Sequence, residues 1–112
     1  MSGWNGYDLD GTIAEYAGWQ GPDHIGKPIP SMIRRIQADL QNGIEVKIFT
    51  ARASVPDMIP AIEAWCIQHI GVKLPVTNIK DFGMTCLYDD RARQVLENRG
   101  IVVGESGEFT LS

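Results

Sequence analysis

The chain has 112 residues, a length that fits one domain and excludes a second folded one. Hydrophobic residues make up 44% and charged residues 21%, which is typical of a soluble globular protein and argues against disorder. Ten Lys and Arg against 14 Asp and Glu give a net charge of −4. This balance argues against a nucleic-acid or anionic-membrane surface spread over the whole protein, but leaves room for a local basic patch.

The two cysteines and the N-terminal residues bear on the cellular compartment. Cys66 and Cys86 fall in a predicted buried helix and a predicted buried strand, and two cysteines are too few for a disulfide framework. Residues 1–8 have neither a basic nor an apolar signal region, and no apolar run approaches the ~18 residues of a membrane span. We therefore expect a cytoplasmic protein without a membrane partner.

The first half of the chain predicts two strands and one helix. Residues 4–7 form a short apolar strand, and a loop rich in Gly and Pro follows from 14 to 30. A helix is predicted over 31–42, capped by Ser31 and ended by Gly43, with apolar residues at the 3.6-residue period: Met32, Ile33, Ile36 and Leu40. The β-branched, alternating segment 44–50 predicts a strand that ends at Thr50.

The second half predicts a further helix and several short strands. The helix begins at Pro56 and ends at Gly71, with its apolar side formed by Ile59, Ile62, Trp65, Cys66 and Ile70. Strands are predicted at 74–77, 86–88 and 101–103, with a helix over 91–98 and a tail, 105–112, that adds an edge strand or frays. Only 78–85 join the third strand to the fourth, and eight extended residues reach about 26 Å, so we expect an extended or single-turn connection.

Alternation of strands and helices predicts an α/β fold with a single doubly wound parallel sheet of about five strands and helices on both faces. Ligands bind at the carboxyl ends of the strands in such sheets. Three predicted strands end in polar residues: Asp8 with Asp10, Thr50, and Asp89 with Asp90. Lys80 is the only lysine placed to reach the same edge. Carboxylates, a hydroxyl and a lysine together suit a hard divalent cation that holds a phosphate.

Each of these features also has a plain structural interpretation. Asp8 and Asp10 are suited to a turn ahead of Gly11, and Asp90 to the N-terminus of the following predicted helix. Thr50 is also explained as a β-branched residue that ends a strand, and Lys80 as a solvated surface side chain. Arg52, two residues after Thr50, is a further candidate whose alternative is an exposed loop side chain. The order of the features along the chain decides between the two interpretations.

The segment Asp8-Leu9-Asp10-Gly11-Thr12-Ile13 follows a strand directly, and Thr50, Lys80 and the Asp89-Asp90 pair come after it at suitable intervals. Together they resemble the four motifs of the haloacid dehalogenase superfamily of phosphohydrolases, over residues 8–95. The resemblance implies a Rossmann-like core with strand order 3-2-1-4-5. Only 13–30 and 78–85 stand where such proteins usually insert a cap domain, so a capless member is expected. Asn5 and Gly6 depart from the aliphatic residues usual in the first strand.

The resemblance also implies roles for single residues. Asp8 is the nucleophile that forms an aspartyl-phosphate, and Asp10 is the general acid and then the base for water. Gly11 lets the chain turn close to the substrate and Thr12 fixes that turn. Thr50 binds phosphoryl oxygens and Lys80 neutralises them, and Arg52 offers a fork to the phosphate or the leaving group. The implied cofactor is Mg2+, held by Asp8, the Asp10 carbonyl and one or both of Asp89 and Asp90.

The sequence therefore predicts a magnesium-dependent phosphatase acting on a phosphomonoester, either a phosphorylated small molecule or the phosphorylated end of a larger substrate. The acidic charge disfavours nucleic-acid polymers. Two alternatives stay open: a phosphotransferase that uses the same residues, and a catalytically silent binding or regulatory module. A site without a cap indicates a large substrate, loose selectivity or cover from a homo-oligomer or from 14–30. In that loop Trp19 and His24 are candidate substrate contacts; the alternatives are hydrophobic cover of the sheet edge for Trp19 and a plain surface position, which is favoured, for His24. Cys66 and His69 share a helix but are better explained by core packing than by zinc binding.

Overall fold

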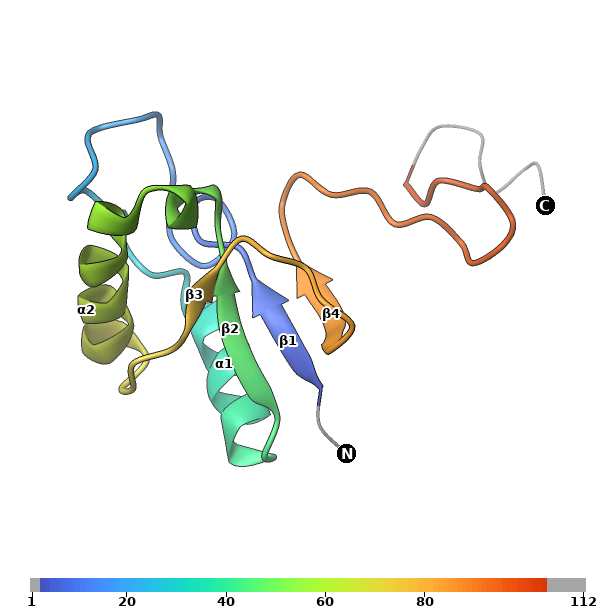
Figure 1. Ribbon diagram of the computed structural model, residues 1–112, viewed down its shortest axis with the longest axis horizontal. Coiled ribbons are helices and arrows are strands. Elements are labelled where there is room, and N and C mark those ends of the chain that lie inside the picture. Colours follow the sequence, from blue (N-terminus) through green and yellow to red (C-terminus); the bar gives the residue numbers. More distant parts are fainter. Residues whose placement is uncertain (1–2, 105–112) are drawn as a thin grey trace.

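The computed structural model of the chain describes residues 3–104. Its architecture is α/β, with an all-parallel four-stranded sheet in the order β3-β2-β1-β4 (Figure 1). The elements in chain order are β1 (Trp4–Tyr7), α1 (Pro30–Gln41), β2 (Glu45–Phe49), α2 (Ile59–His69), β3 (Val76–Thr77) and β4 (Met84–Tyr88). Two short 3-10 helices, Ala51–Ser54 and Pro56–Met58, join β2 to α2. The 3-2-1-4 part of the expected strand order is confirmed.

The first helix begins one residue earlier than predicted. Pro30 occupies the first helical position, where its fixed φ suits the helix and its missing N–H would have had no partner. The cap position is Ile29, so the prediction that Ser31 caps the helix is wrong. Gly43 follows with a φ of +77°, a conformation that glycine adopts without strain, and this residue ends the helix as expected.

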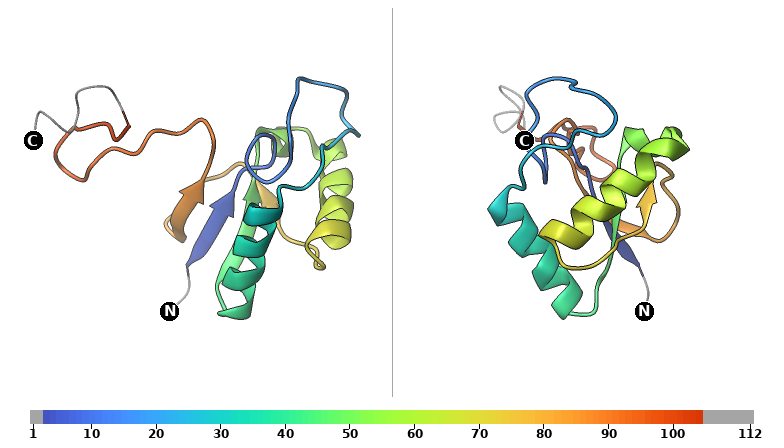
Figure 2. Two further views of the ribbon diagram at one scale, coloured as in Figure 1. Left: turned by 180° about the vertical axis from the view of Figure 1, so that it is seen from behind. Right: turned by 90° about the vertical axis from the view of Figure 1, so that its left-hand side faces the viewer.

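The core lies between the sheet and the two helices, which sit on the same side of it (Figure 2). Alternate residues of β1 and β2 point to this side, where α1, α2 and the segments that follow β1 and α2 contribute the remaining apolar side chains. The buried set includes Tyr7, Val46, Ile48, Ile33, Ile36, Ile62, Trp65 and Cys66. Because α1 and α2 cover one face only, the expected helices on both faces are not confirmed in the part of the chain that the structure describes.

The segment 91–98, which was predicted to be a helix, forms bends and turns and no helix. Its three apolar residues, Ala92, Val95 and Leu96, have the spacing of one helical face, but Val95 is 56% exposed in the structure, and so few apolar residues bury too little surface to stabilise a short helix. Asn98 has a φ of +62°, which is not helical. The predicted strand 101–103 is reduced to one antiparallel bridge between Val102 and Val95, so the described sheet has four strands and not five. The tail 105–112 lies outside the described residues.

The connection from β3 to β4 crosses the face of the sheet opposite the helices (Figure 1). The two preceding crossovers, through α1 and α2, lead from β1 to β2 and from β2 to β3, whereas this connection runs in the opposite direction across the sheet, past β2 and β1. Because crossover connections between parallel strands are right-handed, a connection in the opposite direction must lie on the other face. Trp4 anchors it: its Nε1 donates to Asp81 Oδ1 at 2.8 Å and its backbone N donates to the Gly83 carbonyl at 2.7 Å. Trp4 is only 3% exposed in consequence, with Lys47 Nζ 4.6 Å from its ring centre. The expected extended or single-turn connection is confirmed, because 78–81 form no regular structure and 82–83 form one turn.

The cysteines differ in environment. Cys66 is buried in the core as predicted, whereas Cys86 is exposed. Cys86 lies on β4, an edge strand of the described sheet, beyond the cover of the two helices, so its predicted burial is wrong. Among residues 3–104, no helix is long and apolar enough to cross a membrane.

Candidate active site

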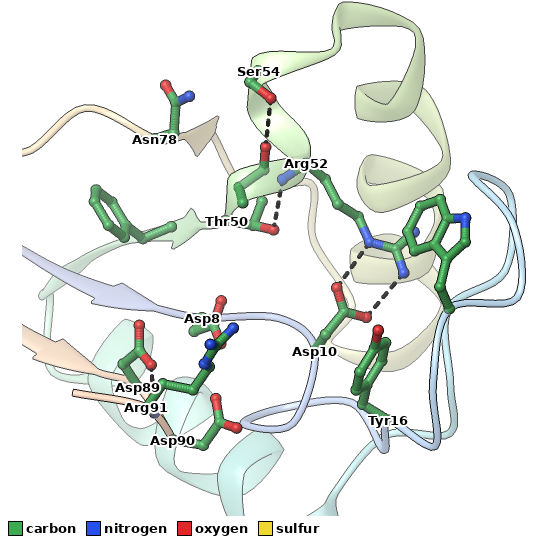
Figure 3. A pocket seen from close by; sticks show the side chains of 13 residues that line it. Asp8, Asp10, Tyr16, Thr50, Arg52, Ser54, Asn78, Asp89, Asp90 and Arg91 are labelled. Atoms are coloured by element: carbon green, nitrogen blue, oxygen red, sulfur yellow. Dashed lines mark hydrogen bonds and ion pairs between the residues drawn. The ribbon is translucent and has the colours of Figure 1, made fainter.

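An open pocket of about 660 Å3 lies at the carboxyl ends of the strands (Figure 3). All four strands contribute residues at or just beyond their ends. The lining consists of Asp8, Asp10, Phe49, Thr50, Ala51, Arg52, Ser54, Asn78, Asp89, Asp90 and Arg91, together with Tyr16 and Trp19 of the loop that follows β1. Backbone bonds from Asp8 N to Tyr88 O and from Thr50 N to Thr77 O, both 2.9 Å, extend the strand pairing to its edge. The predicted convergence of polar strand ends is present.

Three carboxylates form the acidic centre of the pocket. Asp8, Asp89 and Asp90 each offer an oxygen, and these oxygens lie within 4.8 Å of one another. Asp8 and Asp89 are partly buried and Asp90 is exposed. Carboxylate oxygens are hard ligands, so this group could hold a divalent metal ion. The structure thus places both residues of the Asp89-Asp90 pair beside Asp8.

The charge of this centre is unbalanced. Burial, the negative charge of Asp89 and a hydrogen bond with Asp90 together raise the pKa of Asp8 to about 7. A hydrogen bond from the backbone of Leu9 opposes the shift. A carboxyl whose ionised form is disfavoured by burial and by neighbouring carboxylates is one that a cation would stabilise as the anion.

Gly11 and Thr12 fix the position of Asp90. Gly11 has a φ of +86°, and a Cβ at this residue would lie 2.5 Å from Asp90 Oδ2. Thr12 Oγ1 donates to Asp90 Oδ1 at 3.1 Å and accepts from the Asp90 backbone N at 3.0 Å. Thr12 therefore fixes the turn, as predicted, by linking it to the residue that follows β4. The space directly against Gly11, where the sequence predicted a substrate contact, is filled by the Asp90 carboxylate.

Asp10 lies outside the three-carboxylate centre and pairs with Arg52 (Figure 3). Arg52 Nε donates to Asp10 Oδ2 and Nη2 donates to Asp10 Oδ1, both at 2.9 Å. Arg52 is only 7% exposed, and it also donates from Nη1 to the Pro22 carbonyl at 3.3 Å and from Nη2 to the His24 carbonyl at 3.0 Å. Four of its five N–H donors are thus used inside the protein. Arg52 reaches the pocket as predicted, but its fork faces Asp10 and the loop backbone.

Thr50 and Lys80 differ in placement. Thr50 is buried at the pocket wall, with its Oγ1 accepting from the Arg52 backbone N at 3.2 Å. Lys80 is exposed and does not line the pocket. After Thr77 the chain leaves the carboxyl edge, and Asp81 is already bonded to Trp4 at the start of β1. The crossover therefore moves Lys80 away from the edge where the sequence placed it.

Five polar or aromatic lining residues were not predicted from the sequence: Tyr16, Phe49, Ser54, Asn78 and Arg91. Two of them carried a usable signal, because Asn78 directly follows β3 and Arg91 directly follows the Asp89-Asp90 pair. Tyr16 lies in the loop 14–30 and Ser54 in a 3-10 helix. In such segments the periodicity of apolar residues does not predict where a side chain lies. His24 contributes its carbonyl to Arg52 and does not line the pocket.

Comparisons of the chain with protein-family models, curated proteins and solved structures found no match. The chemistry of the site therefore has to follow from its own residues. It combines a carboxylate centre suited to a cation, a separate carboxyl oriented by a guanidinium, and a hydroxyl and an arginine beside them. This arrangement can bind a cation and an anionic ligand, and it contains a candidate nucleophile and a candidate proton carrier.

Proposed function

We propose that the chain is a divalent-cation-dependent hydrolase of phosphomonoesters with Asp8 as the nucleophile. The observation that carries this proposal is the position of Asp8: it directly follows β1, lines the pocket and forms a carboxylate centre with Asp89 and Asp90. The sequence resemblance to haloacid dehalogenase phosphohydrolases supports the same assignment. An isolated acidic pair in a turn would explain neither the pocket nor the third carboxylate.

The donor set fits Mg2+. Asp8, Asp89 and Asp90 would hold the ion through carboxylate oxygens, together with the Asp10 carbonyl that the resemblance implies. The raised pKa of Asp8 is consistent with a centre that lacks a counter-charge of its own. When bound, the ion would supply positive charge against Asp8 and the phosphoryl oxygens.

The residues of the chain divide the reaction between them. An Asp8 oxygen attacks phosphorus, a bond forms between them, and the bond from phosphorus to the leaving oxygen breaks. Asp10 gives a proton to that oxygen and later takes one from the water that hydrolyses the aspartyl-phosphate, which regenerates Asp8 and releases phosphate. Because both Asp10 oxygens accept from Arg52, a proton on Asp10 replaces one of these bonds, and Arg52 thereby orients the acid.

Charge on the phosphoryl oxygens needs donors besides the metal ion. Thr50 and Arg91 line the pocket and are available for this role, while Lys80 is exposed outside it. The neutralising role that the sequence motif assigned to Lys80 therefore passes to Arg91. Arg91 is placed by its own backbone, whose N–H donates to Asp89 Oδ1 at 2.8 Å.

One observation favours a second function, a module that binds a cation and an anion without turnover. Asp10 is held at both oxygens by Arg52, an arrangement that suits a permanent ion pair as well as a proton carrier. The two functions share cation binding and differ in phosphate release.

The deciding experiment measures Mg2+ binding by calorimetry and phosphate release from a panel of phosphomonoesters. The variant is Asp8→Asn, and Asp57→Asn, an exposed carboxyl outside the pocket, is the matched control. We expect phosphate release from the parent chain and Asp57→Asn, and none from Asp8→Asn. Release by Asp8→Asn at the parental rate would refute the proposal. Mg2+ binding without release from any monoester would establish the binding module instead.

A further inference from the structure

Two aromatic side chains stand exposed at one side of the pocket. Tyr16 is 52% exposed and Trp19 is 55% exposed, and both belong to the loop between β1 and α1. Both line the pocket that contains Asp8. Large exposed aromatic side chains beside carboxylates contribute little to a core, and paired at a pocket they indicate a surface for a ligand with an apolar flat face.

Trp19 is supported from one side. The Arg52 guanidinium carbon lies 5.0 Å from the Trp19 ring centre, and Arg52 is itself fixed by Asp10 and by two loop carbonyls. This leaves one face of the indole without that partner and ties the aromatic ring to the same guanidinium that orients Asp10. Arg52 therefore holds the Trp19 ring and the Asp10 carboxyl at a fixed distance from each other.

The loop that carries both aromatic residues contains no helix or strand, but backbone and side-chain contacts hold it in place. Ala14 bridges to Pro28, Glu15 N donates to the Lys27 carbonyl at 2.8 Å, and Trp65 Nε1 donates to the Gly26 carbonyl at 3.0 Å. Gly26 lies so close to Glu15 that a Cβ there would meet its carbonyl oxygen. Binding on such a loop costs less ordering entropy than binding on a free one.

The pocket has room for more than a phosphate. Its 660 Å3 falls within the roughly 300 to 1,000 Å3 of ordinary small-molecule sites. The charges disfavour a polymer, because four carboxylates line the pocket and Arg52 is already paired, which leaves Arg91 as the cation for a phosphate backbone. In an open pocket, a sugar alone would stay largely in water, whereas a planar base buries its flat face on a fixed indole.

We propose that the substrate class is a nucleoside monophosphate, whose base stacks on Trp19 beside Tyr16 while its phosphate faces Asp8. This inference rests on the proposed phosphohydrolase function, which it deepens. Water replaces the nucleoside on phosphorus, so the products are a nucleoside and inorganic phosphate. Ser54 and Asn78, on the wall formed by the ends of β2 and β3, supply a hydroxyl and an amide for the polar edges of the nucleoside.

The test compares ligands that differ only in the base. Calorimetry with Mg2+ and inorganic phosphate measures the binding of adenosine and of ribose, neither of which can react. We expect adenosine to bind roughly 5-fold to 150-fold more tightly, the range that one stacked base contributes. Trp19→Ala abolishes most of this preference and Trp19→Phe keeps most of it. Phe82→Ala, which removes an exposed aromatic side chain outside the pocket, leaves it unchanged.

Because Trp19→Ala also removes a neighbour of Arg52, Tyr16→Ala provides a second, independent variant, and we expect it to weaken the preference too. Equal binding of adenosine and ribose by the parent chain overturns the inference, as does an undiminished preference in both alanine variants. A parallel assay of phosphate release from AMP and ribose 5-phosphate separates the two proposals. Equal hydrolysis of both overturns the nucleotide assignment and keeps the phosphatase. A Trp19-dependent preference for adenosine without any release keeps the aromatic site and overturns the phosphatase.

Discussion

Replacing Gly11 with alanine tests the geometry that holds Asp90 in the carboxylate centre. Gly11 has a φ of +86°, which costs a residue with a side chain about 1 to 2 kcal/mol. The new Cβ would also stand 2.5 Å from Asp90 Oδ2, so Asp90 must move and lose bonds to Thr12 worth about 1 to 2 kcal/mol together. The expected loss in the free energy of unfolding is therefore about 2 to 4 kcal/mol, or roughly 10 °C or more in Tm.

The matched control is Gly43→Ala. Gly43 has a similar φ of +77°, and among the described residues nothing lies within 4 Å of its ideal Cβ position. This variant carries the backbone strain without the collision, so we expect it to lose about 1 to 2 kcal/mol. Thermal unfolding of both metal-free variants gives the difference, and calorimetric titration with Mg2+ gives the functional consequence. Gly11→Ala should weaken Mg2+ binding at least tenfold, and Gly43→Ala should not change it.

Two results would refute this reasoning. Equal losses of stability in the two variants would mean that Asp90 does not pack against Gly11. Parental Mg2+ affinity in Gly11→Ala would mean that the position of Asp90 is irrelevant to the cation, and Asp90 would then leave the proposed ligand set.

Three further predictions concern the metal, the buried arginine and pH. Chelation with EDTA should abolish phosphate release and Mg2+ should restore it, whereas Ca2+, with longer bonds and higher coordination, should bind without supporting release; full activity after exhaustive chelation would contradict this. Arg52→Lys should lower the free energy of unfolding by about 1 to 3 kcal/mol and slow turnover, because lysine cannot form the bidentate pair with Asp10, while Mg2+ affinity stays parental. The control is Arg34→Lys at an exposed position, and a loss of Mg2+ affinity in Arg52→Lys would count against the separation of the two sites. Burial and the charge of Asp89 raise the pKa of Asp8 to about 7 in the metal-free chain, so between about pH 4 and 7 the folded state holds a proton that the unfolded state has lost. The free energy of unfolding should therefore fall as pH rises through this range. Denaturant titrations that show no such fall, or a fall that Asp8→Asn leaves intact, would exclude Asp8 as its origin.

The elements with strong local signals were predictable from the sequence. The apolar period of 31–42 and the alternation of 44–50 correspond to α1 and β2, because each places its buried residues on the face that meets the core. The rule that parallel strands present ligands at their carboxyl ends correctly predicts that Asp8, Thr50 and Asp89 lie at one edge of the sheet. The same rule applied to β3 also predicts Asn78 at this edge.

The remaining features depend on the path of the chain in space. Lys80 has left the pocket edge because β4 lies on the far side of β1, which sends the crossover down the opposite face. The pairing of Arg52 with Asp10 joins residues 42 positions apart, a contact that no local pattern encodes. The helix expected over 91–98 had three apolar residues at helical spacing, but none of them packs against the core of the described structure, and helical propensity alone does not stabilise so short a segment.

The central claim, that Asp8 carries the phosphoryl group, is tested most directly by a rapid-quench time course with p-nitrophenyl phosphate and Mg2+ in the Asp10→Asn variant. Nitrophenolate leaves without a proton, so formation of the phosphoenzyme should be nearly spared while its hydrolysis, which needs Asp10 as base, is slow. We predict a burst of nitrophenol, followed by a slow steady state, with one phosphoryl group mapped by peptide mass to Asp8. Steady release of nitrophenol without a burst, and with no phosphoryl group on Asp8, would contradict the account.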